Sequence, residues 1–414
     1  MNFPLFIARK IAGKDETGKR LTRTTNVIAI ISVTLSIFVM FLALSIVSGF
    51  KKEISEKVRG FSGDIVLTPP GMAIVNDHYP VNGDLSYIEK IESMRQVERV
   101  CGVAYRPGMI KSDDNVFGIL LKGVDSLYDM SFYSSHLTEG RLPDLRGNSA
   151  ANEVLISRRL SDKIGLNTGD RLVSYYTGES VRIRQFTICG IYDVELQDVD
   201  QMLAIVDIRQ VQRLNGWSNG EVSTIEIRLV SGSDKEVSVL KIEDIIMSES
   251  IDKDTPLFVT SVEDHYPVLF EWLNLLDYNV LIIMILMIIV AGFNMISGLL
   301  IILFEKISMI GVLKSLGMRD KSIAAIFLYR GSFLMLKGML WGNVIGLLFA
   351  LLQNKFHIIT LDPQNYFVSF VPVNVTAEIL LILNICSFIA ITAMLIIPTL
   401  FISKISPDKS VRVK

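Results

Sequence analysis

The chain has 414 residues, of which 50% are hydrophobic and 20% are charged, and its mean hydropathy is +0.43. It is too apolar for an ordinary soluble protein and too charged to lie within a membrane throughout, so we expect membrane spans joined to a water-facing domain. A net charge of −2 argues against the basic footprint of a nucleic-acid-binding protein, and the three cysteines have no metal-binding or redox spacing.

The amino-terminal segment, residues 1–25, is predicted to form an amphipathic helix on the cytoplasmic membrane surface. Its apolar residues that fall on one helical face are Phe3, Phe6, Ile7 and Ile11. The next segment, 26–50, carries no charge and is predicted to be the first span. Its helix is expected to continue beyond the membrane as a stalk, because an apolar stripe at helical spacing runs on through Ile54 and Val58 to Phe61.

Residues 51–272 are predicted to form a large domain outside the cytoplasm. A β-α-β pattern occurs twice, first at 65–68, 86–94 and 100–110, and again at 224–230, 235–247 and 257–262. Two such units are typical of a split β-α-β sandwich, and a β-rich insert at roughly 125–220 separates them. A second stalk is expected before the second span, because apolar residues from Leu269 to Leu276 also recur at helical spacing.

Four segments are apolar enough to cross a bilayer core, which takes about 20 residues: 26–50, 273–304, 330–353 and 379–402. Basic residues concentrate before the first span, in the loop 305–329 and in the tail 403–414, whereas the loop 354–378 carries only Lys355. The positive-inside rule therefore predicts that both termini are cytoplasmic and that the large domain is not. The predicted fold class is an α-helical membrane protein with a 1+3 arrangement of spans around a large α+β extracytoplasmic domain.

The loop 305–329 is patterned like a short helix lying on the membrane surface. Its apolar residues at positions i, i+3, i+4 and i+7 are Met309, Val312, Leu313 and Leu316. Gly317 is the expected end of this helix, and Asp320 is expected to cap the next one. The pattern fits either a docking element or a turn that rests among the lipid headgroups.

The first two spans hold two further sets of candidates. In the second span, Asn294 lies among small residues that include Gly292 and Gly298, which favours close helix packing, and a dimer seam is the functional alternative. Candidates for a substrate cleft are Met40, Leu44, Val47, Met284 and Met287. Ordinary lipid or helix contact is the alternative for this second set.

Several phrases resemble the MacB/FtsX-type ABC permeases, and most of all the lipoprotein-releasing permeases of the LolC/LolE type. FEKISMIGVLKSLGM resembles their coupling loop, PLFIARK their opening, and GLNTGDRL with the later FTICGIY their periplasmic domain. The resemblance implies that the coupling loop seats in a separate ATPase. The residues so implicated are Glu305, Lys306, Met309, Ile310, Val312, Leu313, Lys314, Leu316, Gly317 and Met318.

The resemblance further implies an inner-membrane permease subunit that pairs with an identical or similar permease and with two copies of a cytoplasmic ATPase. The chain itself has no P-loop, so we expect it to be non-catalytic, with ATP and Mg²⁺ bound by the ATPase. The implied cargo is a lipoprotein that passes to a periplasmic chaperone. A long hook loop recruits this chaperone in one branch of the family, whereas here only residues 176–180 stand at that point.

Two alternatives to lipoprotein release stay open. The first is mechanotransmission, in which the same machine drives efflux or controls a periplasmic hydrolase. The second is a membrane-tethered sensing or adhesion protein without an ATPase. The sequence also leaves open whether Cys101 and Cys189 form a disulfide or are two buried thiols.

Overall fold

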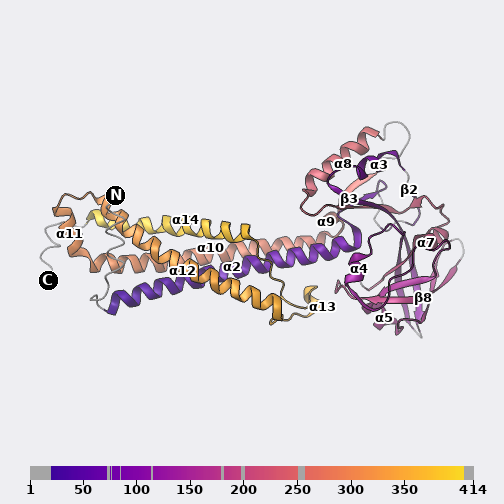
Figure 1. Ribbon diagram of the computed structural model, residues 1–414, viewed down its shortest axis with the longest axis horizontal. Helices are drawn as coiled ribbons and strands as arrows, with labels where there is room; N and C mark the ends of the chain where they lie inside the picture. The colour runs from indigo at the N-terminus through magenta and orange to yellow at the C-terminus, as the bar shows by residue number, and fades with distance from the viewer. Residues whose placement is uncertain are drawn as a thin grey trace. The chain divides into compact units, whose positions relative to one another are not determined.

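The computed structural model describes residues 20–71, 75, 77–83, 85–112, 115–178, 181–196, 201–249 and 257–404 (Figure 1). The predicted surface helix at 1–25 and the tail 403–414 therefore lie largely outside the described residues. The chain divides into two compact units. We call residues 1–52, 272–360 and 370–414 the helical unit, and residues 53–271 and 361–369 the β-rich unit.

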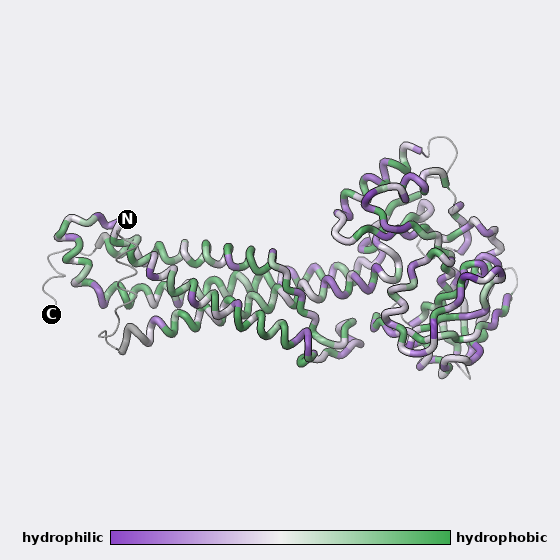
Figure 2. The backbone as a smooth tube through the Cα atoms, in the orientation of Figure 1, coloured by the Kyte–Doolittle hydropathy of each residue, from purple (hydrophilic) through white to green (hydrophobic). Residues whose placement is uncertain are grey.

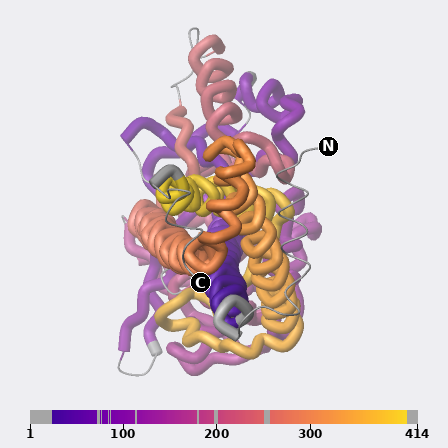
Figure 3. The backbone as a smooth tube through the Cα atoms, turned by 90° about the vertical axis from the view of Figure 1, so that its left-hand side faces the viewer, coloured from indigo at the N-terminus to yellow at the C-terminus, as the bar shows by residue number. Residues whose placement is uncertain are grey.

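Four long helices make up most of the helical unit, as predicted: α2 (Arg20–Ser62), α10 (Pro267–Glu305), α12 (Asp320–Phe356) and α14 (Ala377–Thr399). Each contains a stretch long and apolar enough to cross a membrane. Hydrophobic residues run along these helices in Figure 2, and Figure 3 shows the bundle end-on. Helices α2 and α10 extend into the β-rich unit without a break, which confirms the predicted continuation of both spans as stalks.

A stripe of three glycines packs α12 against α2. A Cβ atom added to Gly338 would lie 2.7 Å from the Cβ of Val33, and one added to Gly342 would lie 2.8 Å from the Cβ of Ile37. Gly346 approaches the ring of Phe41 in the same way. Small residues four apart let helix backbones approach closely in a membrane. This contact holds the first span against the third, and the sequence analysis missed it.

The first half of the β-rich unit is a four-stranded antiparallel sheet in the order β12-β1-β11-β3. Its strands are β1 (Ile65–Thr68), β3 (Val97–Ser112), β11 (Thr224–Leu229) and β12 (Phe258–Ser261). Helices α3 (Ser86–Glu92) and α8 (Lys235–Glu249) pack together and against it. This is the order of a ferredoxin-like split β-α-β fold, and it confirms the predicted repeat.

The second half is a closed barrel that the sequence analysis described only as a β-rich insert. Around the barrel each strand pairs with the next in the order β3-β4-β9-β6-β8-β7 and back to β3. The added strands are β4 (Asn115–Val124), β6 (Glu153–Ser157), β7 (Arg171–Tyr176), β8 (Arg182–Tyr192) and β9 (Leu203–Asp207). The barrel thus begins before residue 125, because β4 and the second part of β3 belong to it.

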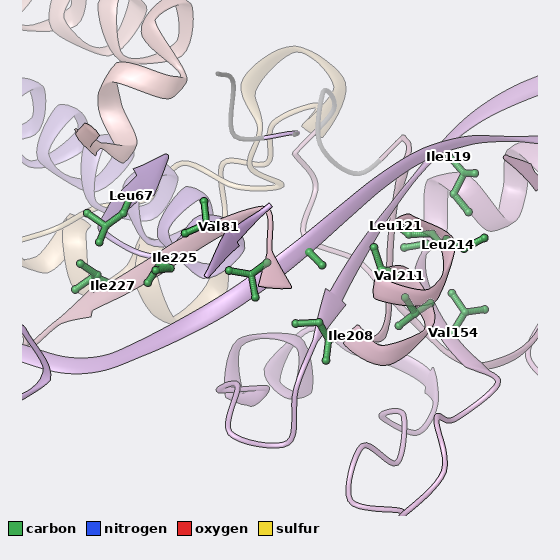
Figure 4. Packing of buried hydrophobic residues seen from close by; sticks show 14 of the residues in the cluster. Leu67, Val81, Ile119, Leu121, Val154, Ile208, Val211, Leu214, Ile225 and Ile227 are labelled. Atoms are coloured by element: carbon green, nitrogen blue, oxygen red, sulfur yellow. The ribbon is translucent and has the colours of Figure 1, made fainter. Parts of the chain in front are cut away.

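Strand β3 joins the two halves, since its first part pairs with β11 and its second part with β4 and β7. One hydrophobic core runs through both halves (Figure 4). It includes Leu67 and Ile227 in the sheet and Leu121 and Val154 in the barrel, all fully buried. A movement of one half is therefore felt by the other, because packed interiors transmit strain.

The remaining elements are short. They are β2 (Val81–Asn82), β5 (Leu137–Gly140), β10 (Glu221–Val222), α4 (Ser131–Ser135), α5 (Arg158–Ile164), α7 (Ile208–Asn215), α9 (Val262–His265), α11 (Ile307–Ser315), α13 (Pro363–Tyr366) and η1 (Leu400–Lys404). Among them, α11 is the predicted short helix between the second and third spans. In Figure 3 it lies at the end of the bundle that faces the viewer.

Candidate functional site

Helix α11 ends where the sequence predicts. Gly317 adopts a left-handed conformation with φ of +83°, which suits glycine because it has no Cβ. Its amide donates to the carbonyl of Lys314 over 2.9 Å, and the amide of Met318 donates to the carbonyl of Leu313 over 3.0 Å. These two bonds form a Schellman motif, which satisfies the last carbonyls of the helix and turns the chain sharply into α12.

The predicted cap of α12 is wrong. The helix already begins at Asp320, and the capping position is Arg319, which forms no side-chain cap. Asp320 instead lies 2.9 Å from the Nζ of Lys314, and the same Nζ donates to the carbonyl of Ile402 over 2.7 Å. Lys314 thus joins α11 to the start of α12 and to η1, and its side chain is only 10% exposed.

Two exposed apolar side chains lie on α11 and at the residue that caps its carboxyl end. Val312 is 50% exposed and Leu316 is 78% exposed, whereas Ile310 is fully buried within this chain. The other predicted coupling residues are half-buried, apart from the exposed Gly317: Glu305, Lys306, Met309, Leu313, Lys314 and Met318. Val312 and Leu316, which we call the α11 patch, are therefore the part of the predicted coupling site that is available to a partner.

A groove of about 370 Å³ lies between α2 and α10, with Ile379 of α14 at its side. Three of the predicted cleft residues line it, namely Leu44, Val47 and Met284. Met40 is fully buried and Met287 is half-buried, and neither belongs to its lining.

Charged groups also line this largely apolar groove, because Lys51 of α2 forms an ion pair with Asp277 of α10 there. Both residues belong to the helical unit, and their side chains are 34% and 55% exposed. The groove therefore combines an apolar wall with one cation and one anion.

Small and polar residues pack the second span against its neighbours. The Nδ2 of Asn294 donates to the Oγ of Ser32 on α2. A Cβ atom on Gly292 would lie 2.2 Å from the sulfur of Met394 on α14, and one on Gly298 would lie 3.6 Å from the Cβ of Ala29. Within this chain the three residues thus serve helix packing, and the predicted dimer seam stays a prediction.

The β-rich unit contains a buried ion pair that sequence reasoning missed. The Nζ of Lys122 on β4 lies 2.8 and 2.9 Å from the two carboxylate oxygens of Glu226 on β11. It also donates to the hydroxyl of Tyr128 over 3.0 Å and to the carbonyl of Phe61 in the last turn of α2. The hydroxyl of Tyr105 donates to Glu226 over 3.0 Å.

Burial dominates the electrostatics of this cluster. It lowers the pKa of Lys122, and the charge of Glu226 opposes that shift. It raises the pKa of Tyr105 well above the ordinary value, and Glu226 adds to the increase. The sequence signal was weak, because Lys122 and Glu226 lie on separate strands and only a lysine within the apolar strand GILLKGV marks the place.

All three cysteines are free, and Cys101 and Cys189 are buried, so the structure has the two buried thiols rather than a disulfide. Burial raises the pKa of each of these two thiols to about 12. A thiol with such a pKa is unreactive at neutral pH, because the thiolate is the nucleophile.

Two family models match the chain. That of the MacB-like periplasmic core domain matches residues 27–245, and that of the FtsX-like permease C-terminal matches residues 281–407. The chain belongs to the MacB/FtsX family of ABC transporter permeases. As a MacB/FtsX permease it is a multi-pass membrane protein, and the first match alone covers more than half of the chain.

Relatives of this MacB/FtsX permease match almost end to end. "Lipoprotein-releasing system transmembrane protein LolC" of Xylella fastidiosa is 21% identical, over 93% of this chain and 92% of that protein. LolC of Neisseria meningitidis is 22% identical, over 94% of both chains. LolE of Haemophilus influenzae is 21% identical, over 90% of both. Each of these matches spans both the spans and the β-rich unit rather than one domain.

Among solved structures, the match to the periplasmic region of MacB from Actinobacillus actinomycetemcomitans covers 51% of this chain and 95% of that structure, with 12% identity and a TM-score of 0.36. The match to the extracellular domain of YknZ from Gram-positive bacteria covers 48% of this chain and 98% of that structure, with 12% identity and a TM-score of 0.33.

In the MacB/FtsX permease described here, β7 and β8 pair as far as Tyr176 and Arg182. Residues 177–181 alone join them.

Proposed function

We propose that this permease is the membrane subunit of an ABC transporter that releases lipoproteins from the inner membrane for sorting to the outer membrane. The observation that carries the proposal is the match, over 93% of the chain, to relatives named as transmembrane proteins of a lipoprotein-releasing system. The groove between α2 and α10 supports it, because a lipoprotein needs an apolar surface for its acyl chains. Leu44, Val47 and Met284 supply that surface.

Releasing a lipidated cargo from the membrane requires an energy source. An acyl chain that moves from the bilayer into an apolar groove exchanges one apolar environment for another, so this step is nearly neutral. Exposing the chain to water costs about 0.8 kcal/mol for each CH₂ group, or on the order of 10 kcal/mol for one whole chain. The sequence contains no P-loop to supply this energy, so we assign ATP and Mg²⁺ to a separate cytoplasmic ATPase dimer.

The α11 patch is the proposed entry point of the force. Val312 and Leu316 are exposed apolar residues on a short helix between two spans, which suits a groove on an ATPase subunit. Basic residues in the same loop support a cytoplasmic location for it and for both termini. The β-rich unit is then periplasmic, and a second permease, identical or similar, completes the complex.

The proposed cargo transfer ends on a periplasmic carrier. The short connection at residues 177–181 argues against a hook on this chain. We therefore assign direct recruitment of a lipoprotein chaperone, if one is used, to another surface or to the second permease.

Mechanotransmission without lipid cargo is the second candidate, and the unbroken helices α2 and α10 favour it, because they lead from the spans into the β-rich unit. In that case the machine drives efflux or controls a periplasmic hydrolase. An adhesion or sensing protein without an ATPase is the third candidate, and it predicts no role for the α11 patch.

Photocrosslinking separates these candidates. A photoreactive amino acid is placed in turn at Leu44, Val47 and Met284 in the groove, and at Leu348 on α12, which is 57% exposed, as the control. Lipoprotein release predicts adducts with lipoproteins at the groove positions, loss of these adducts when ATP is added, and none at Leu348. If no groove position yields a lipoprotein adduct, the cargo assignment is wrong and mechanotransmission is favoured.

A further inference from the structure

The carboxyl end of α2 is fastened to the sheet of the β-rich unit at two buried points. At the first, Lys122 of β4 binds the carbonyl of Phe61 in α2 and both carboxylate oxygens of Glu226 in β11. A carbonyl in the last turn of a helix has no partner within the helix, so this bond supplies one from a strand. The positive charge also complements the negative end of the helix dipole.

The second point is Asp64, which lies two residues after the end of α2 and is 5% exposed. Its carboxylate lies 2.9 Å from the Nε of Arg59 in α2 and accepts a hydrogen bond of 2.8 Å from the amide of Leu229 in β11. Its carbonyl accepts from the amide of Val262 in α9 over 3.1 Å, just ahead of α10. Asp64 thus connects the end of α2 with β11 and with α9, the short helix that precedes α10. We call Asp64, Lys122, Tyr128 and Glu226 the stalk joint.

Stability alone is a weak reason for such an ion pair. Removing two charges from water costs several kcal/mol per ion, and buried pairs can often be replaced by apolar groups of similar volume without loss of stability. The pair does supply connectivity: a single ammonium group, fully buried, holds three elements, α2, β11 and the turn that carries Tyr128. The pair lies at the end of α2, which runs without a break from the first span. A force that pulls on this helix would therefore reach the sheet at the pair.

We propose that Lys122 is a positioning residue of the transport cycle, which makes β11 and the barrel follow the movement of α2. The proposal rests on the proposed function, because it presumes a movement of α2 that is driven by ATP. Strand β11 pairs with β3, and β3 continues into the barrel, so the joint is connected to the whole β-rich unit. Loss of the joint should uncouple ATP hydrolysis from work without abolishing hydrolysis itself.

The test uses the complete complex with the variant Lys122→Met/Glu226→Gln. This change removes both buried charges, and the glutamine still accepts from the hydroxyl of Tyr105. The control is Arg158→Met/Glu139→Gln, because these residues form a partly exposed ion pair of 2.5 Å between α5 and β5 and neither is one of the joint residues. Both complexes are checked for assembly, thermal stability and ATP hydrolysis before release is measured.

We expect the joint variant to assemble and to hydrolyse ATP, but to release about tenfold fewer lipoproteins per ATP, within the usual range for coupling between sites. The control should match the wild type. Wild-type release per ATP in the joint variant would overturn the proposal. If the double variant does not assemble, Tyr128→Phe replaces it, because it removes only one hydroxyl from the joint. It should lower release per ATP at unchanged hydrolysis, and unchanged release would likewise overturn the proposal.

A second measurement does not depend on the cargo. Hydrogen exchange of the β11 amides is compared with and without ATP and vanadate. The proposal predicts a nucleotide-dependent change in the wild type that is lost in the joint variant and kept in the control. A change that persists in the joint variant, or no change in the wild type, contradicts the proposal. If the wild type releases no lipoproteins, the proposed function fails, while this measurement still decides the role of Lys122.

Discussion

The glycine stripe on α12 gives a quantitative prediction about the membrane helices. Replacing Gly342 with alanine places a Cβ atom 2.8 Å from the Cβ of Ile37 and 2.9 Å from the carbonyl oxygen of Thr34. Non-bonded carbon atoms prefer a separation of about 3.5–4.0 Å, so the added atom is too close by roughly 0.7 Å or more. Neither neighbour can rotate away, because one is a backbone atom and the other is bonded directly to the backbone. The helices must therefore move apart.

Overpacking of this kind costs about 1–3 kcal/mol. A loss near 2 kcal/mol lowers the ratio of folded to unfolded protein by about 30-fold, because each 1.4 kcal/mol is a factor of ten. The matched control is Gly298→Ala in α10, where the new Cβ atom would lie 3.6 Å from Ala29, an ordinary contact. It should cost little, since it also replaces glycine with a better helix former.

The assay is unfolding of the purified protein by SDS in mixed micelles, followed by circular dichroism. Gly342→Ala should unfold at a clearly lower SDS fraction than the wild type, and Gly298→Ala at nearly the same fraction. If Gly342→Ala is as stable as the wild type, or if Gly298→Ala is equally destabilised, the close packing of α2 on α12 is refuted.

Three further predictions concern other parts of the chain. Gly317→Ala should destabilise the turn after α11 by about 1–2 kcal/mol, because a residue with a Cβ atom is strained in the left-handed conformation. Proteolysis of the loop 305–329 should then be faster than in the wild type. An unchanged cleavage rate would contradict this prediction. Cys101 and Cys189 should not react with N-ethylmaleimide at neutral pH until the protein is denatured. As a control, a cysteine introduced by Val181→Cys should react at once, because this position is 66% exposed. Labelling of Cys101 in the native protein would contradict the burial of the thiols. Burial lowers the pKa of His265 from 6.5, so below that pH the unfolded chain binds more protons at this residue than the folded chain does. The free energy of unfolding should therefore fall as the pH drops below about 6.5. The variant His265→Asn should weaken this dependence, and an unchanged pH profile would contradict the assignment.

The spans and the ferredoxin-like half followed from local patterns. Apolar stretches of sufficient length predicted the four membrane helices, and alternation with turns predicted the strands β1 and β12 to within a residue. The end of α11 was equally local, because glycine alone among ordinary residues accepts the conformation of Gly317 at little cost.

Contacts between elements far apart in the sequence could not be predicted from local patterns. The barrel closes only because β7 reaches back to β3, and nothing in either strand specifies that partner. The stripe at Gly338, Gly342 and Gly346 has a recognisable four-residue spacing, yet the spacing does not say that α2 covers it. The cap of α12 failed for a related reason, since Lys314 draws Asp320 into an ion pair.

The same limit applies to the candidate sites. Met40 was a cleft candidate on the first span, but it is fully buried and does not line the groove. Helical spacing identified an apolar face on α11, of which only Val312 and Leu316 are strongly exposed. Which face of a helix meets a partner depends on the fold as a whole.

The central claim is that a cytoplasmic ATPase acts on this chain through α11. The most direct test is to purify the tagged Leu316→Asp variant gently and to measure how much of the ATPase that accompanies the wild type still accompanies the variant. Leu240→Asp, on α8, is the matched control, because Leu240 is 65% exposed and Leu316 is 78% exposed. The account predicts loss of the ATPase from Leu316→Asp and full retention by Leu240→Asp. Full retention by Leu316→Asp, or a wild type that brings down no ATPase, would contradict it.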